Sequence, residues 1–263
     1  MAFWLFPAFM LIALFYASIG FGGGSSYNAL LALSGADYRI YPAIALACNI
    51  LVVTGGTFHF ARAGHVKWRQ ILPLIISSIP MAMLGGMLYV PEIFFTLALS
   101  AALFASSLFI LYPLTPINGL KLPKLNDPLP PSVNIWGSIA VGGFLGLVAG
   151  ITAIGGGIFL APILYYWRWG NAHQIAAACA LFICVNSISG LAGQMIKITH
   201  AGLLSELSVY WTLLIAVFIG GQAGSIFTNK YLPEKMIRLL TAILLAFVSI
   251  QLLWRGYKIW YDI

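Results

Sequence analysis

The sequence predicts an all-α polytopic membrane protein of about eight transmembrane helices, arranged in two four-helix repeats. The first observation is composition: 61% of the 263 residues are hydrophobic, only 7% are charged, and the mean hydropathy is +0.97. A soluble domain carries about 25% charged residues, so this chain is built for a bilayer. The second observation is a glycine cluster at residues 20–24 that returns as Gly155–Gly157 about half a chain later.

Eight apolar segments are long enough to cross a membrane, which takes about 20 residues of helix. They cover residues 2–34, 41–61, 70–90, 93–115, 134–167, 172–196, 207–229 and 236–254. The first and fifth are too long for one straight crossing, and each contains a glycine triplet. Glycine costs about 1 kcal/mol relative to alanine inside a helix, so we expect the first helix of each repeat to break there and continue as a short half-helix.

A proline-rich stretch divides the chain into two similar halves. We predict a first repeat at 1–116, a linker at 117–133 and a second repeat at 134–263. Placing Gly22–Gly24 on Gly155–Gly157 also brings Arg62 near Lys197, in the same order along both halves, which indicates an internal duplication. Four spans per repeat is an even number, so we expect the halves to share one orientation, as parallel transporter repeats do.

The basic residues are expected to set the orientation in a cell (inner) membrane, because Lys and Arg collect on the cytoplasmic side. With the N-terminus inside, eight of them are cytoplasmic and five are outside. The eight are Arg62, Lys67, Arg69, Lys121, Lys124, Lys197, Arg255 and Lys258. We therefore expect cytoplasmic N- and C-termini.

The broken helices predict a binding site. Irregular backbone survives at membrane depth only inside protein or beside a wet cavity, and a half-helix N-terminus with free N–H groups attracts an anion. The expected substrate-binding residues are Gly22, Gly23, Gly24, Ser25, Ser26, Asn28, Asn49, His59, Thr152, Gly155, Gly156, Gly157, Asn186 and Gln194. The alternative is that the glycines only let helices approach closely and that the polar side chains bond helix to helix.

The second glycine copy resembles a known family. The pattern Gly-x-Gly-Gly-Gly followed by an apolar run, Pro and Leu, together with residues 153–164 and the alanines 176–178, is similar to the TauE/SafE family of sulfite exporters, also described as the toluene-sulfonate uptake permease group. The first copy departs from it, with Ala29 in place of the proline and two serines after the glycines. The resemblance implies a secondary transporter of small sulfur-containing anions such as sulfite, sulfonates or sulfoacetate.

The charged residues are consistent with an anionic substrate. No carboxylate lies at the centre of a span, as a proton relay or a cation pump would require. Arg62 and Lys197 are expected to attract the anion, or else to anchor span ends by snorkelling. If protons are the coupling ion, the carrier is His59 or the substrate itself, although His59 fits an interfacial position equally well.

An anion channel and an intramembrane enzyme are the alternatives. An enzyme is not expected, because Gly24-Ser25-Ser26 is not a nucleophile turn and the histidines lack metal-binding spacing. We thus expect no catalytic residue, metal or cofactor. The partners are the small anion and the bilayer, with no nucleic acid, because the basic residues sit in loops. Tryptophans 4, 68, 136, 167, 169, 254 and 260 are expected to anchor span ends at the membrane surface.

Overall fold

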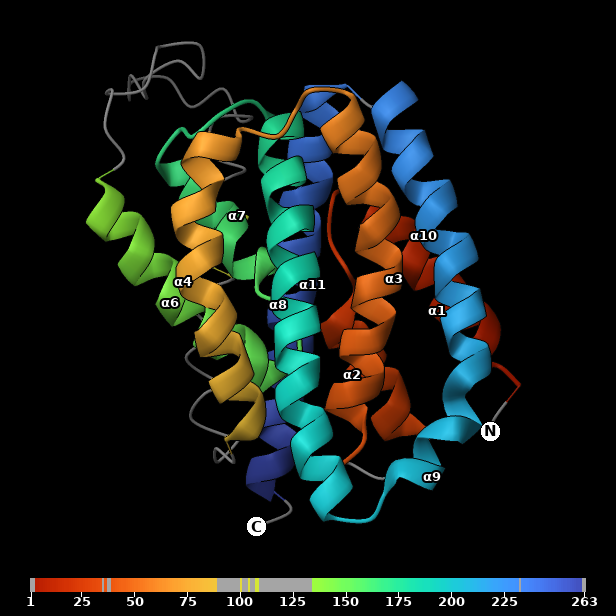
Figure 1. Ribbon diagram of the computed structural model, residues 1–263. Helices are drawn as coiled ribbons and strands as arrows, with labels where there is room; N and C mark the ends of the chain where they lie inside the picture. The colour runs from red at the N-terminus through yellow and green to blue at the C-terminus, as the bar shows by residue number, and fades with distance from the viewer. Residues whose placement is uncertain are drawn as a thin grey trace.

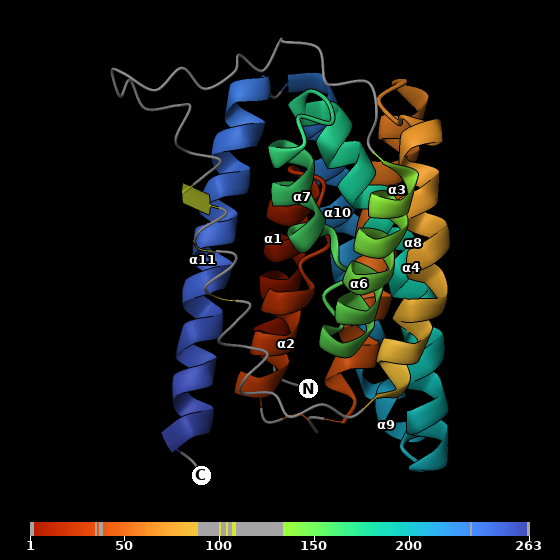
Figure 2. The same cartoon turned by 90° about the vertical axis from the view of Figure 1, so that its left-hand side faces the viewer.

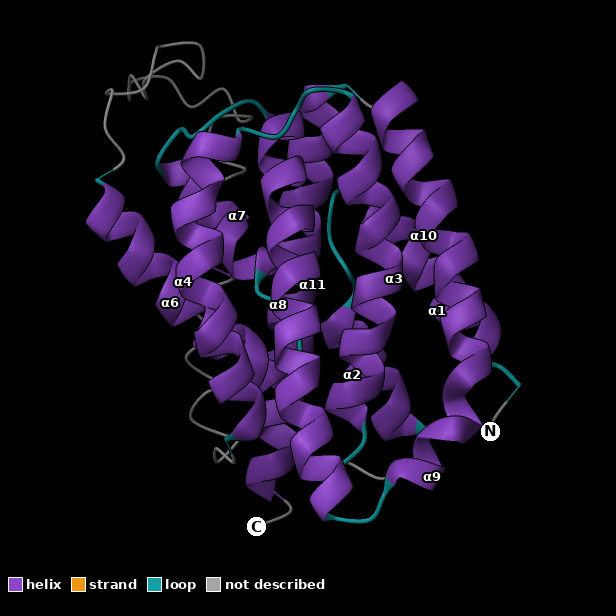
Figure 3. Cartoon of the chain, viewed as in Figure 1, coloured by secondary structure: helices purple, strands orange, loops and turns teal. Residues whose placement is uncertain are grey.

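The computed structural model describes residues 3–34, 36, 39–88, 100, 104, 107–108, 134–231 and 233–261, and every element among them is helical (Figures 1 and 3). The helices are α1 (Leu5–Ala17), α2 (Gly24–Leu33), α3 (Tyr41–Arg62), α4 (Trp68–Met87), α6 (Ile135–Thr152), α7 (Gly157–Tyr166), α8 (Ala172–His200), α9 (Leu204–Leu207), the 3-10 turn η2 (Ser208–Tyr210), α10 (Trp211–Tyr231) and α11 (Glu234–Tyr261). The predicted linker and most of the span predicted at 93–115 lie outside the described residues.

Five segments of the described chain are long and apolar enough to cross a membrane: α3, α4, α6, α8 and 204–226. The polytopic helical membrane fold is therefore as predicted. Both predicted helix breaks are present as well. The first lies between α1 and α2 and the second between α6 and α7, and each half-helix begins at the last glycine of its triplet.

The second broken helix turns back to the end of the bundle where it started. Gly142 of α6 lies against Leu74, and Gly150 lies against Ala82, so α6 runs in the same direction as α4. Gly157 contacts Cys179 and Ile183 in the middle of α8, while the short loop after α7 leads straight into the start of α8. Hence α7 returns toward the end from which α6 came (Figure 2).

The first broken helix turns back in the same way at the opposite end. The glycines at 220 and 224 of α10 lie against Met10 and Leu14, so α1 runs parallel to α10, and α2 descends again to the start of α3. We call the end where α1 begins and α11 ends the termini end (Figure 1). The other end, which carries the α3–α4 and α7–α8 loops, we call the histidine end, after His65 and His173.

This geometry contradicts the expected parallel repeats. A broken helix that returns to its own side adds no crossing, so the first half starts at the termini end while α6 starts at the histidine end. The helices α3 and α8 accordingly run antiparallel: Asn49 and Ser187 lie at one level, and His65 and His173 meet at the histidine end. The two halves therefore have inverted topology.

Glycine stripes pack helices of one half onto helices of the other. Glycines 142, 146 and 150 of α6 lie on the backbone of α4, and glycines 220 and 224 of α10 lie on α1. A side chain at Gly146 would collide with the Ser78 carbonyl oxygen. Close backbone approach through small residues is the usual packing of membrane helices. The halves therefore interlock instead of forming two separate bodies.

Of the tryptophans predicted as anchors, Trp167 is half-buried, and the side chain of Trp260 lies outside the described part of the structure. Trp4, Trp68, Trp136 and Trp254 are exposed near helix ends, where membrane-surface anchors are expected. Trp169 is only 1% exposed, so its prediction as an anchor was wrong. The α7–α8 loop folds inward there, and Lys67 Nζ lies 5.3 Å above the Trp169 ring and donates to its carbonyl oxygen at 2.9 Å. This contact ties the α3–α4 loop to the α7–α8 loop.

Candidate anion-binding site

Asn49 lies where the two glycine breaks meet, near the middle of α3. Its side chain is fully buried, and neither its Nδ2 nor its Oδ1 atom has a hydrogen-bond partner within the described chain. A buried amide without partners costs roughly 1 to 3 kcal/mol, so such a group is rare unless something else binds it. Asn49 is thus the strongest single indication of a ligand.

The glycines of both breaks surround this amide. A Cβ at Gly22 would lie 2.5 Å from Asn49 Oδ1, and a Cβ at Gly24 would lie 2.8 Å from Nδ2 and 2.8 Å from the Ala153 carbonyl oxygen. From the second break, a Cβ at Gly155 would lie 3.3 Å from Asn49 Nδ2. Only glycine leaves room here, so the triplets bring bare backbone to one amide.

The backbone also requires glycine at three of these positions. Gly23 has a φ of +86°, and Gly155 and Gly156 each have a φ of +82°. An L-residue in this region costs about 1 to 2 kcal/mol. The glycine triplets therefore form turns as well as close contacts. Helix packing alone would require the small side chain but not the positive φ.

Ser187 of α8 completes the group. Its hydroxyl is buried and has no partner among the described residues, and a Cβ at Gly155 would lie 2.9 Å from its Oγ. The preceding residue, Asn186, is also buried; its Nδ2 donates to the Phe182 carbonyl at 2.9 Å, while its Oδ1 has no partner in the same part of the chain. From the sequence, Ser187 fits a helix-to-helix hydrogen bond and a place in the site equally well, and it was not among the expected substrate-binding residues. Its only sequence signal was its place in the polar stretch 186–189.

Two half-helices begin beside this group. The helices α2 and α7 begin at Gly24 and Gly157, and their first backbone N–H groups have no partner inside the helix. Each end carries about half a positive charge. With an unpartnered buried asparagine and serine between them, the two ends form a site suited to an anion.

The predicted serines lie in the first turn of α2 but are bonded to another side chain. Ser26 Oγ lies 2.7 Å and Ser25 Oγ 3.5 Å from the Tyr16 hydroxyl, and all three residues are buried. Tyr16, at the end of α1, was not predicted. This arrangement connects the two pieces of the first broken helix beside the site.

Asn28 and Thr152 join the two breaks on the side that faces the termini end. Asn28 Nδ2 donates to the Thr152 carbonyl oxygen at 3.4 Å, and the Thr152 hydroxyl donates to the Val148 carbonyl at 2.8 Å. Asn28 Oδ1 has no partner among the described residues. The predicted residues 28 and 152 therefore lie together, as a polar contact below the site.

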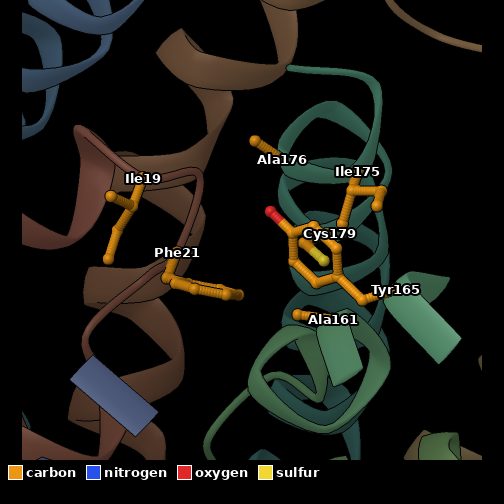
Figure 4. A pocket seen from close by; sticks show the side chains of 7 residues that line it. All are labelled: Ile19, Phe21, Ala161, Tyr165, Ile175, Ala176 and Cys179. Atoms are coloured by element: carbon orange, nitrogen blue, oxygen red, sulfur yellow. The ribbon is translucent and has the colours of Figure 1, made fainter. Parts of the chain in front are cut away.

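The side that faces the histidine end is apolar. The side chains that line a small pocket there leave no room for a water molecule. Figure 4 shows Ile19 and Phe21 of the first break facing Tyr165, Ile175, Ala176 and Cys179 across it. Because Asn49 and Ser187 are fully buried, the site is closed toward both ends.

Four predicted residues lie away from this group. His59 is ten residues beyond Asn49, or about 15 Å along α3, with its ring against Phe58. Gln194 lies two turns beyond Ser187, and its Nε2 donates to the Gly150 carbonyl at 3.5 Å between α8 and α6. Arg62 ends α3 at the histidine end, whereas Lys197 lies near the end of α8 at the termini end. The expectation that both cations share the cytoplasmic side was wrong, because the halves are inverted.

The histidine end carries a second polar group. The His65 and His173 rings lie 5.2 Å apart. Burial and the neighbouring His173 lower the pKa of His65, and burial lowers the pKa of Lys67. These residues join loops from the two halves above the apolar pocket. Across the described residues, no group of three histidines, cysteines or carboxylates is close enough to hold a metal ion.

The comparison with known proteins gives two kinds of match. The family model described as Sulfite exporter TauE/SafE matches residues 5–252. A protein of Sinorhizobium fredii named "Probable membrane transporter protein y4hK" is 34% identical over 247 residues, covering 94% of this chain and 96% of that protein. A "Probable membrane transporter protein" of Haemophilus influenzae is 29% identical over 177 residues, covering 66% of this chain and 65% of that protein. No solved structure matches the chain.

Proposed function

Because this chain belongs to the TauE/SafE sulfite exporter family and is a membrane transporter, we propose that it moves a small sulfur-containing oxyanion by a secondary transport mechanism. The anion binds between Asn49, Ser187 and the N-termini of α2 and α7. The observation that carries this proposal is the Asn49 amide, which is fully buried, contacts both glycine breaks and has no hydrogen-bond partner among the residues that the structure describes.

The closed site favours alternating access over the channel alternative. A channel in its open state needs a continuous path, whereas here the polar group is sealed by Asn28 and Thr152 on one side and by Phe21 and its apolar neighbours on the other. A site closed at both ends is an intermediate that a transporter must pass through.

The intramembrane enzyme is less well supported. The hydroxyls of Ser25 and Ser26 are bonded to Tyr16, and the described histidines at 59, 65, 173 and 200 all lie toward helix ends. A serine nucleophile would need a base within hydrogen-bond reach. Transport is the function that the unpartnered, closed polar group fits.

The interlocked halves change the expected motion. Movement of the first repeat against the second would pull α4 off α6 and α10 off α1. We expect instead that α1, α2, α3 and α10 move as one body against α4, α6, α7 and α8. The boundary between these bodies is the contact of α3 with α8, where Asn49 and Ser187 lie. The binding residues therefore come from both moving parts.

The inverted topology also changes the expected orientation. Among the described residues, seven Lys and Arg lie toward the histidine end and four toward the termini end. The seven are Arg62, Lys67, Arg69, Arg168, Lys230, Lys235 and Arg238, and the four are Arg39, Lys197, Arg255 and Lys258. Lys and Arg favour the cytoplasm, so we propose a cytoplasmic histidine end and external termini, the reverse of the sequence expectation.

Transport by purified protein in proteoliposomes tests the function. We expect uptake of sulfite, thiosulfate or a short sulfonate, and loss of that uptake in Asn49→Leu, which keeps the branching of the side chain at Cγ but removes the amide. The matched control is Thr54→Val on the same helix, because Thr54 is exposed and its hydroxyl donates to Ile50 of its own helix. Transport of cations or neutral solutes, and of none of these anions, would contradict the proposal.

A further inference from the structure

Within the part of the chain that the structure describes, the site offers an anion no charged partner. No Asp, Glu, Lys or Arg occurs at residues 5–33, 41–61, 70–88, 93–115, 135–167, 172–196, 211–229 or 239–254. The charged residues that the structure describes therefore belong to helix ends and loops, several turns from Asn49. The negative charge must be stabilised by dipoles alone.

Those dipoles match a single negative charge. The N-termini of α2 and α7 each supply about half a positive charge, which gives about one in total. The cost of moving an ion out of water grows with the square of its charge, so a dianion costs about four times as much as a monoanion of the same size. Without a buried cation, this site balances one charge and leaves the second uncompensated.

The hydrogen-bonding groups place a second condition on the ligand. Asn49 Nδ2 and the backbone N–H groups donate, but Asn49 Oδ1 is an acceptor, and it has no partner among the described residues. A fully deprotonated oxyanion carries only acceptors, so its oxygens would oppose Oδ1 and leave it unsatisfied. A ligand with one acidic hydrogen would satisfy both sides of the amide.

We infer that the site binds its substrate as a singly charged oxyanion that keeps an acidic hydrogen, as hydrogensulfite does. This inference rests on the proposed function and specifies the form of the substrate. Hydrogensulfite crosses with its own proton and releases that proton, as sulfite forms, on the more alkaline side. No protein side chain then has to carry the proton, which agrees with the distance of His59 from Asn49.

The test measures sulfite uptake into proteoliposomes at a fixed total concentration, with equal pH on both sides. The initial rate is expected to follow the hydrogensulfite fraction, falling about tenfold per pH unit above the second ionisation of sulfurous acid. Two competing anions test separately the argument from charge and the argument from the acidic hydrogen. Sulfate, a dianion throughout, should not inhibit. Methanesulfonate, a monoanion without an acidic hydrogen, should inhibit more weakly than hydrogensulfite and independently of pH.

Variants at Asn49 test the role of the acceptor oxygen. Asn49→Ser retains a small donor and acceptor, and Asn49→Leu removes both. Because Asn49→Leu is expected to lose uptake, its ligand preference is measured as the rise in melting temperature that each anion gives in detergent. The preference for hydrogensulfite over methanesulfonate should shrink in the leucine variant, and melting without an anion should show that both variants fold. If Asn49→Leu does not fold, the wild-type competition data alone decide the matter.

Two results would overturn the inference. Sulfite uptake that is constant or rises with pH would mean that the dianion is transported, and so would inhibition by sulfate equal to that by sulfite. Either result leaves the proposed function standing. Absence of uptake of every sulfur oxyanion at every pH would instead remove the proposed function, and this inference with it.

Discussion

The substitution Gly155→Ala tests whether the glycine break is the binding site or only a turn. The alanine would lower the free energy of unfolding in two ways. The φ of +82° adds about 1 to 2 kcal/mol of backbone strain. The new methyl group would also lie 2.7 Å from Ile183 Cγ2 and 2.9 Å from Ser187 Oγ, and overpacking of this kind costs about 1 to 3 kcal/mol.

Gly64→Ala is the matched control. Gly64 has a similar φ of +73°, but nothing lies within 4 Å of its would-be Cβ. The free energy of unfolding of Gly64→Ala should fall only by the backbone strain, about 1 to 2 kcal/mol, and this variant should transport at nearly the wild-type rate. Gly155→Ala should melt lower still and bind sulfite at least tenfold more weakly, because the methyl group displaces the Ser187 hydroxyl.

Thermal melting in detergent, with and without sulfite, and uptake into proteoliposomes measure these effects. The double variant Gly155→Ala with Ser187→Ala completes a double-mutant cycle, because removal of the Ser187 hydroxyl partly relieves the crowding around the new methyl group. Its melting temperature should exceed that expected from adding the single effects. Equal transport by folded Gly155→Ala and Gly64→Ala would refute the reasoning, since the break would then be unrelated to binding.

Four further predictions follow from other parts of the molecule. Gly146→Ala should destabilise the protein strongly, because its side chain would collide with the Ser78 carbonyl oxygen. Gly143→Ala, three residues earlier on α6, should be tolerated, because the nearest atom to its new methyl group would be Met81 Cγ at 3.7 Å; equal melting temperatures of the two variants would contradict the stripe packing. A C-terminal alkaline phosphatase fusion should be active in a bacterial host and a C-terminal GFP fusion dark, and the reverse pattern would place the termini inside. The pKa of His65 lies below its usual value, so protonation of His65 favours the unfolded state, and the melting temperature should fall as the pH drops below about 6.5. His173→Gln should weaken this pH dependence. An unchanged profile of melting temperature against pH would show that the histidine pair is not responsible. Phe21→Ala should speed sulfite entry from the histidine end severalfold, as measured by comparing right-side-out with inverted vesicles, and no change would exclude Phe21 as a barrier.

The sequence predicted the breaks because glycine has a local and strong effect on helices. Gly23, Gly155 and Gly156 have positive φ angles that other residues avoid, and the need for glycine shows in the sequence as three consecutive glycines. Asn49 could likewise be proposed from one polar residue in an apolar span. These features depend on few residues close together in the chain.

The direction of the chain after each break could not be read in the same way. A window of hydropathy gives the same result for a helix that crosses the membrane and for one that goes in and returns. The error in that single step reversed the relation of the repeats and placed Arg62 and Lys197 on one side. Trp169 and Ser187 required tertiary information too, because a loop folds Trp169 inward and the pitch of α8 turns Ser187 toward Gly155.

The two routes to the site differ in chemistry even though the halves correspond. The shift that places Gly22 on Gly155 also places Ile19 on Thr152 and Asn28 on Ala161. In the structure both sets of counterparts lie beside the breaks: Asn28 donates to the Thr152 carbonyl, and Ile19 and Ala161 line the apolar pocket. An anion approaching from the termini end meets a weak polar contact that can exchange its hydrogen bond for one to the ligand. From the histidine end it meets hydrocarbon, which must move aside because it offers no such exchange. Inverted repeats that both break at a glycine triplet thus produce unequal barriers, and the unequal residues are those in which the first glycine copy departs from the second.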